Sequence, residues 1–323
     1  MASVANLIQP IDVDPYTRRD YPASDPNLEN LIDNWAHYKD HLIIFLGAGA
    51  SVGARNTQGS PLPAAYHLRN AIWENFMLAP QDRAAFDFSN LALMTLEHAA
   101  ALAEARSDIR TLKKFVSDYF LVDKPLWPHA VLRFLRAKAM LTTNYDTLVE
   151  LGWALPTIGM KCKSLKQVFR DSDSLNSVFV PLYKPHGSIE FPLNKVGEGG
   201  LVLTQFDYFE MVNSRTRMLD QFMSAFNESC VLFIGYGFQD LDIASRLYAM
   251  RRNDRGPRWY AVFPRDNRDV RNMYAERYDI RQINRTFNDF LVDLDTAVDF
   301  VPQDWKFDKI DELIRRGFLQ PRV

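Results

Sequence analysis

The chain has 323 residues, 47% of them hydrophobic, so it is long enough to bury a substantial core in about two domains. Its net charge of −2 and pI near 6.3 exclude an overall attraction to nucleic acid, and we expect no direct nucleic-acid binding. No apolar run approaches the ~18 residues of a membrane span, and the N-terminus lacks the order of a secretory signal, so we expect a cytoplasmic protein with no membrane partner. With only Cys162 and Cys230 and no CxxC pair, the chain is expected to bind no metal.

The first elements of the chain are an arm and a strand. Residues 1–40 are predicted to form an N-terminal arm, because their beginning is rich in proline and polar residues. The run LIIFL at 42–46 follows, and its apolar character predicts a strand buried on both faces.

A helical region follows this strand. Residues 62–137 show no convincing strand but have helical patterns at 64–77, 90–105 and 110–120. We predict a helical insertion here, which either forms a wall of a substrate cleft or serves packing alone.

The rest of the chain alternates between short apolar strands and helices. Strands are predicted at 139–143, 178–184, 230–236 and 259–263, and helices at 207–226, 241–252 and 268–278. Apolar strands alternating with helices predict a parallel sheet covered on both faces. The predicted fold class is therefore α/β, a Rossmann-like doubly wound sheet formed by residues 41–61 and 138–285. The helical segment 286–323 either packs on this core or mediates assembly.

A glycine-rich turn, Gly47-Ala48-Gly49-Ala50-Ser51, ends the first predicted strand. Such a turn lets backbone amides approach an anionic group, and a diphosphate would suit it. The spacing departs from the usual dinucleotide fingerprint, because Val52 replaces the third glycine and Gly53 comes one residue late. The turn alone is weak support for a nucleotide site.

Polar residues also follow three later strands. Asn144 and Asp146 follow the strand at 139–143, His186 follows the next, and Gly235 and Gly237 end the strand at 230–236. Because the carboxyl ends of parallel strands form the ligand crevice of an open sheet, these segments are expected to converge. Each has a simpler interpretation as a helix cap, a turn histidine or turn glycines, but their joint placement favours a site.

Taken in order, these segments resemble a known pattern. Gly47 to Ser51, Gly59-Ser60-Pro61-Leu62-Pro63, Thr143-Asn144-Tyr145-Asp146 and His186-Gly187 are similar to the sirtuin (Sir2) motifs. With Gly235-Tyr236-Gly237-Phe238 and the Asp-Leu-Asp at 240–242, the set resembles the sirtuin-like NAD hydrolase domains of bacterial anti-phage defence proteins over about residues 40–265. The chain lacks the zinc cysteines of deacetylating sirtuins, and Tyr236 interrupts the later glycines.

The resemblance implies NAD as the substrate and cleavage of its nicotinamide–ribose bond, with water as acceptor in the defence branch. The nicotinamide nitrogen of NAD is cationic and leaves neutral, so the site needs no acid but must position water and steady the ribose. By resemblance, Asn144 orients water and ribose, Asp146 holds the carboxamide and His186 is the general base, a role that suits histidine. The expected cofactor-binding residues are Gly47, Ala48, Gly49, Ser51, Thr143, Gly235, Gly237 and Asp242.

The leading hypothesis is an NAD+ glycohydrolase that acts as the toxic effector of an abortive-infection system. Because a cell cannot tolerate such an enzyme running freely, we expect control by assembly. Self-association is expected, and the family suggests a HerA-type ATPase or an Argonaute-like protein as a separate regulatory partner. A sensor that binds NAD or ADP-ribose without cleavage and an NAD-dependent protein deacylase stay open as alternatives.

Overall fold

The computed structural model describes residues 14–322, except residues 23, 157–161, 171–172, 174–177, 239, 254–256 and 265–267. The first 13 residues of the predicted N-terminal arm therefore lie outside the described residues. None of the described helices combines the length and the apolar composition needed to cross a bilayer.

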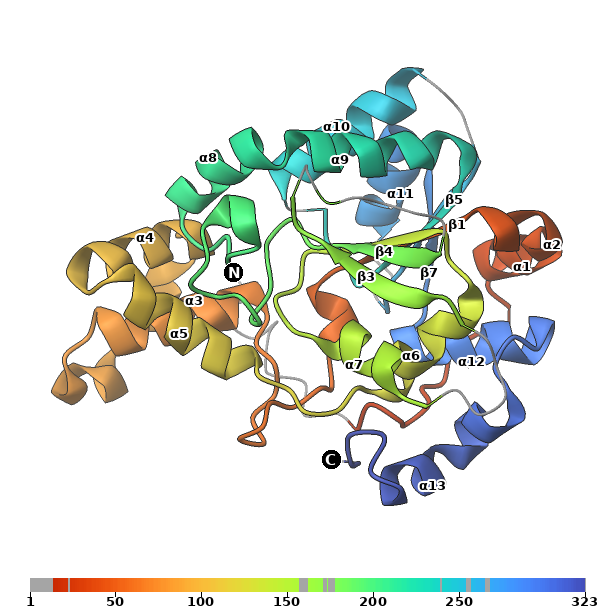
Figure 1. The fold of residues 1–323 in the computed structure, drawn as a ribbon, viewed down its shortest axis with the longest axis horizontal. Helices are drawn as coiled ribbons and strands as arrows, with labels where there is room; N and C mark the ends of the chain where they lie inside the picture. The colour runs from red at the N-terminus through yellow and green to blue at the C-terminus, as the bar shows by residue number, and fades with distance from the viewer. Residues whose placement is uncertain are drawn as a thin grey trace.

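A seven-stranded parallel sheet forms the centre of the molecule (Figure 1). Its strands are β1 (Leu42–Leu46), β2 (Ala139–Thr142), β3 (Ser164–Val168), β4 (Phe179–Tyr183), β5 (Cys230–Ile234), β6 (Trp259–Val262) and β7 (Ile280–Ile283). They lie in the order β3-β4-β2-β1-β5-β6-β7, and every adjacent pair is parallel. Strand order reverses at β1, next to β5, which is where open α/β sheets bind ligands. The predicted Rossmann-like, doubly wound α/β fold is confirmed.

Alternate side chains of each central strand enter two separate cores, as the period of a strand requires. Leu42, Ile44 and Leu46 of β1 pack on one face. Ile43 and Phe45 pack on the other. The first face is covered by α1 (Pro26–Asp33), α2 (Trp35–Tyr38), α6 (Trp127–Val131), α7 (Leu148–Ala154), α12 (Phe287–Val298) and α13 (Ile310–Arg315). The second is covered by α9 (Thr216–Ser224), α10 (Leu241–Asn253) and α11 (Arg268–Tyr278).

The predictions differ from the structure at the sheet edges and in one helix. Both β3 and β7 were missed, because these edge strands contain polar residues and only continuous apolar runs predicted strands. The helix predicted at 207–226 is two helices, α8 (Gln205–Ser214) and α9, which meet at Arg215. The helix predicted at 90–105 begins later, since α4 (Leu96–Arg106) starts after the capping residue Thr95.

The helices of the insertion have a core of their own. α3 (Ala65–Phe76), α4 and α5 (Ile109–Phe120) pack around buried apolar residues, and no residue from 62 to 137, all of them described, belongs to a strand of the sheet. Tyr145 joins this core, and its hydroxyl donates to the Val202 carbonyl at 2.6 Å. Because Tyr145 stands between Asn144 and Asp146, the helical core holds the loop that carries both residues.

The loops after β1 and β5 touch through glycine backbones. The Gly47 amide donates to the Ile234 carbonyl at 3.0 Å, and the Gly49 amide donates to the Gly235 carbonyl at 2.9 Å. Gly235 has a φ of +62°, and a Cβ there would lie 2.3 Å from the Ala50 nitrogen. A Cβ on Gly49 would lie 2.7 Å from the Gly235 Cα. These glycines are therefore required by the approach of one loop to the other, whatever else they bind.

Gly235→Ala tests this contact. It places a Cβ against backbone in a left-handed conformation, so we expect the free energy of unfolding to fall by roughly 2–5 kcal/mol in chemical denaturation. Gly59→Ala is the matched control, because Gly59 has a φ of +82° but a Cβ added there would meet no atom within 4 Å. That control should cost only the backbone strain of about 1–2 kcal/mol. Equal losses in the two variants would contradict the contact.

Candidate functional site

A hydrogen-bonded cluster joins the loops after β1 and β2. The Asn144 side-chain amide donates to the Gly47 carbonyl at 3.0 Å and to Ser51 Oγ at 2.9 Å. Ser51 Oγ in turn donates to Asp146 Oδ2 at 2.7 Å. The structure therefore brings Asn144, Asp146 and Ser51 together, as expected for residues that follow the carboxyl ends of neighbouring parallel strands. Asn144 Oδ1 makes no hydrogen bond with the described residues and is available to a ligand.

Asp146 is held within the protein by both of its carboxylate oxygens. Oδ2 accepts from Ser51, and Oδ1 accepts from the Leu148 amide at the start of α7 at 3.1 Å. Burial raises the pKa of Asp146, while the nearby Lys184 ammonium acts to lower it. The helix-cap interpretation of Asp146 thus has a direct contact behind it, and its hold on a carboxamide stays a prediction.

Lys184 ties the Asn144 loop to the His186 loop. Its ammonium, at the end of β4, is fully buried and donates to the Asp146 carbonyl at 2.7 Å and to Glu150 Oε1 at 2.8 Å. It also reaches Ser188 Oγ at 3.3 Å. If the two loops moved apart, the buried ammonium would lose these partners and its charge would be left uncompensated, which is costly. Lys184 therefore fixes the relative position of the two loops. Sequence reasoning missed it, because only His186 of KPHGS was considered.

A buried arginine holds the backbone around His186. The Arg215 guanidinium donates to the carbonyls of Lys184 at 3.3 Å and Gly200 at 3.2 Å, and also to those of Pro185 and Val196. Burial lowers the pKa of Arg215 to about 10, which still leaves it charged at neutral pH. Arg215 occupies the junction of α8 and α9, so these helices are attached to the His186 loop.

His186 is paired with a carboxylate that the sequence did not suggest. Its Nε2 lies 2.8 Å from Asp240 Oδ2, in an ion-pair contact whose alignment is poor for a hydrogen bond. The ring of Tyr208 packs at an angle to the His186 ring, with centroids 5.2 Å apart. Burial acts to raise the pKa of Asp240, but the contact with His186 and the backbone amides of Ile243 and Asp242 together lower it by more, so the net shift is downward. Such a carboxylate stabilises an imidazole that takes up a proton.

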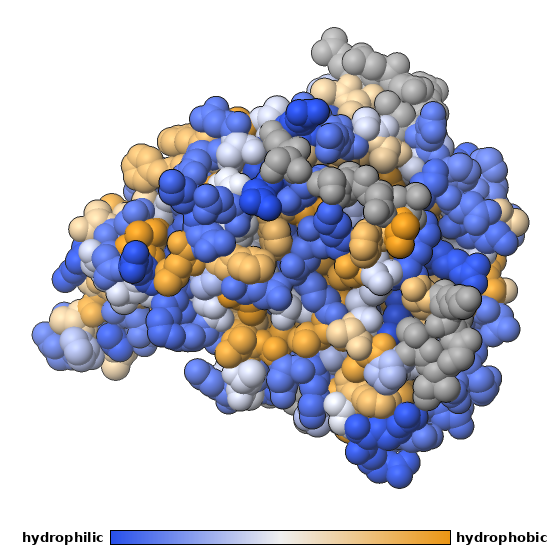
Figure 2. Space-filling view, viewed as in Figure 1, coloured by the Kyte–Doolittle hydropathy of each residue, from blue (hydrophilic) through white to orange (hydrophobic). Residues whose placement is uncertain are grey.

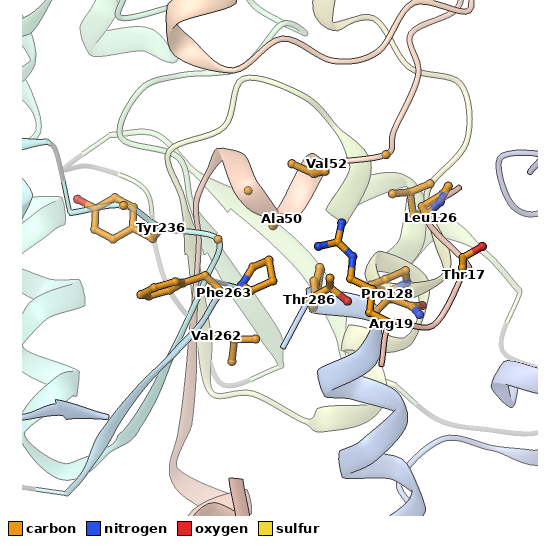
Figure 3. A pocket seen from close by; sticks show the side chains of 18 of the residues that line it. Thr17, Arg19, Ala50, Val52, Leu126, Pro128, Tyr236, Val262, Phe263 and Thr286 are labelled. Carbon is orange, nitrogen blue, oxygen red and sulfur yellow. The ribbon is translucent and has the colours of Figure 1, made fainter. Parts of the chain in front are cut away.

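A cleft opens on the other side of the glycine turn, beside β5 and β6 (Figure 3). Its volume is about 470 Å³, within the range of small-molecule sites. Gly49, Gly235 and Gly237 line it, and its other walls are mostly apolar, with Val52, Leu126, Pro128, Val262 and Phe263 among them. Asn144 and His186 lie beyond the turn, at the ends of β2 and β4. The cleft and the polar cluster thus flank the glycine turn from opposite sides.

Residues 14–22, here named the N-terminal strap, contribute Asp14, Pro15, Thr17 and Arg19 to the wall of this cleft. A Cβ on Gly53 would lie 2.6 Å from Pro15, which shows how closely the strap packs. The buried Tyr16 donates its hydroxyl to the Gln320 carbonyl at 2.9 Å. The guanidinium of Arg19 extends into the cleft toward the turn that carries Ala50 and Val52 (Figure 3).

The remaining predicted residues have varied positions. Ala48 and Gly49 are exposed at the tip of the turn, and the Thr143 amide donates to the Leu46 carbonyl at 3.2 Å. Asp242 lies in the first turn of α10, where its carboxylate is 3.5 Å from Arg246, and it does not line the cleft. Tyr236 turns its ring away from the cleft and packs on Phe45, with ring centroids 4.4 Å apart (Figure 3).

No group of three or more histidine, cysteine or acidic side chains suited to a metal ion occurs within the described ranges.

Asp240→Asn tests the pairing with His186. Because its pKa is lowered in the folded protein, the ionised carboxylate contributes stability above the ordinary aspartate pKa of about 4 and loses it as pH falls through the lowered value. We expect the variant to lose about 1–3 kcal/mol of unfolding free energy at neutral pH and to show a shallower fall in acid. Urea unfolding across this pH range measures both, with Asp118→Asn on the exposed face of α5 as the control. If Asp240→Asn keeps the wild-type pH profile, as the control should, the pairing does not contribute to the free energy of unfolding.

Comparisons with known proteins bear on this architecture. A family model described as SIR2-like domain matches residues 138–283, which run from just before β2 to the end of β7. One solved structure, described as "Structural Basis for the Mechanism and Regulation of Sir2 Enzymes", is similar over 85% of this chain and 98% of that chain, with 12% identity and a TM-score of 0.49. No curated protein matches the chain.

Proposed function

We propose that this protein is an NAD+ glycohydrolase that cleaves the nicotinamide–ribose bond to give nicotinamide and ADP-ribose. The observation that carries the proposal is the arrangement around the glycine turn, which has an apolar cleft on one side and a polar cluster on the other. A dinucleotide has the same order of parts, since a diphosphate separates two nucleosides. The SIR2-like domain supports an NAD-related activity in particular.

The proposed binding mode follows from this arrangement. One nucleoside occupies the cleft beside β5 and β6, and the nicotinamide riboside reaches toward Asn144 and His186. The diphosphate crosses the turn between them. Because the amides of Gly47 and Gly49 already donate to carbonyls of the β5 segment, they do not supply the phosphate contact. The exposed tip of the turn and the Arg19 guanidinium are the better candidates.

The proposed chemistry uses Asn144 and His186. The bond between C1′ and the nicotinamide nitrogen breaks, and the nitrogen keeps the electron pair and leaves neutral. Water forms the new C–O bond at C1′ and gives a proton to the His186 ring, whose charge Asp240 then stabilises. Asn144 Oδ1, which has no partner among the described residues, orients the water or a ribose hydroxyl. Lys184 and Arg215 keep these loops in place.

We further propose that assembly controls this activity, as a self-associated complex or with a HerA-type or Argonaute-like partner in anti-phage defence. The defence role rests on the resemblance of the loop motifs. Assembly has support at α8, where Phe206 and Phe209 are 60% and 64% exposed and hydrophobic side chains gather on the surface (Figure 2). Tyr208 on the same helix contacts His186, so only α8 would separate a partner bound there from the proposed base.

A sensor that binds NAD or ADP-ribose without cleaving it is the second candidate. Both oxygens of Asp146 have protein partners, which favours a structural role for this residue. Binding alone would still use the cleft and the glycine turn. The two functions differ in whether nicotinamide is released.

Nicotinamide release from NAD by the purified protein, followed over a range of protein concentrations, tests the proposal. We expect release to rise more steeply than in proportion to concentration if assembly activates the protein. Asn144→Ala and His186→Gln should each reduce release by about 100-fold or more, because each removes a group that positions or activates water. Asn75→Ala, on an exposed face of α3, should retain full activity.

Two results would contradict the proposal in different ways. Intact NAD bound tightly at every concentration would favour the sensor. Full activity in His186→Gln would place the chemistry elsewhere.

A further inference from the structure

Asn288 has a buried side-chain amide with no partner among the described residues. The residue is 4% exposed, and neither Nδ2 nor Oδ1 forms a hydrogen bond with them. It lies in the first turn of α12 and lines the cleft. Beside it, Thr286 and Asp289 bond to each other through Asp289 Oδ2 and the Asp289 amide, and Asp289 Oδ1, which has no hydrogen bond, lies 3.4 Å from Arg18 Nε in an ion pair. Asn288 thus differs from Asp289 in that neither of its side-chain polar atoms has a hydrogen bond or an ion-pair contact with the described residues.

An unpaired buried amide is costly, so it indicates a missing partner. Nearly all buried polar groups in native proteins have hydrogen bonds, and those that lack them need an explanation. Here two atoms of one side chain are unpaired at the wall of a cleft wide enough for a ligand. The explanation that fits both facts is a bound molecule that supplies a donor and an acceptor.

The chemistry of the amide limits what that molecule can be. Oδ1 only accepts hydrogen bonds, so an anion such as a phosphate or carboxylate would leave it unpaired. The nearby walls include Pro128, Phe263 and Phe287, which suit the faces of a flat ring. Adenine offers an amino donor beside a ring-nitrogen acceptor on one edge, the pattern that an asparagine amide pairs with, whereas the same edge of guanine has two acceptors.

We propose that Asn288 is a specificity-determining residue that recognises the adenine of the substrate, with Nδ2 donating to a ring nitrogen and the 6-amino group donating to Oδ1. This inference rests on the proposed function, because it assumes a dinucleotide substrate. Asn288 stands outside residues 138–283, so the selectivity comes from a helix beyond the matched domain. It also sets the direction of the dinucleotide, with adenosine at the α12 end and the cleaved bond toward His186.

The test compares binding of ADP-ribose with that of its analogue carrying unsubstituted purine, which lacks the 6-amino group. Isothermal titration of the wild-type protein should give about tenfold tighter binding of ADP-ribose, the value of one hydrogen bond. Asn288→Leu keeps the size of the side chain and removes both polar atoms. In that variant the ratio of the two affinities should fall to about one. Asn75→Leu on α3 should keep the wild-type ratio.

Each outcome decides the inference. A ratio that Asn288→Leu leaves unchanged overturns it, as does a wild-type protein that binds both ligands equally or binds neither. Thermal unfolding shows that the variant is folded, and the removal of unpaired polar groups should raise its midpoint in the absence of ligand. Nicotinamide release is measured separately. A protein that shows the predicted ratio but releases no nicotinamide would overturn the hydrolase proposal and leave the adenine contact standing.

Discussion

The contact between the β1 and β5 loops is the constraint on which the rest of the site depends. Backbone meets backbone there, and Gly49 and Gly235 leave no room for a Cβ. Because the order of the strands reverses at β1 and β5, the cleft and the polar cluster lie on either side of this contact, and any widening of it would move them apart. The two glycines thus allow the cleft and the polar cluster to lie close to each other.

Buried cations do the corresponding work on the β2 and β4 side. Lys184 and Arg215 each bond to backbone carbonyls of neighbouring loops, and each is fully buried. A carbonyl within a loop has no strand partner, so a buried donor with several hydrogens is an efficient way to satisfy a group of them. The same bonds fix the loop that carries His186. The buried cations Lys184 and Arg215 thus hold the loop, while the neighbouring His186 carries the proposed chemistry.

Much of the fold could be predicted from the sequence, because β1, β2, β4, β5 and β6 are almost wholly apolar and most of their residues are buried. The edge strands β3 and β7 could not, since polar residues such as Gln167 in β3 and Gln282 in β7 interrupt the apolar run. For the site, the polar residues directly after strands were informative, and Asn144 and Ser51 do meet. Asp240, Arg215 and Asn288 were missed because they come from a loop, a helix junction and a helix start whose approach is set only by tertiary packing. The division into domains, the catalytic roles and the partners stay predictions.

The bond between Tyr16 and Gln320 joins residues 304 positions apart in the chain. Gln320 also uses its side chain to hold Arg55 and Lys124, so one late residue secures three earlier segments. During synthesis these bonds form only after residue 320 has emerged from the ribosome. A nascent chain that has not reached this point therefore lacks the bonds that hold the strap against the cleft, and any ligand that needs this wall can bind only after synthesis is nearly finished.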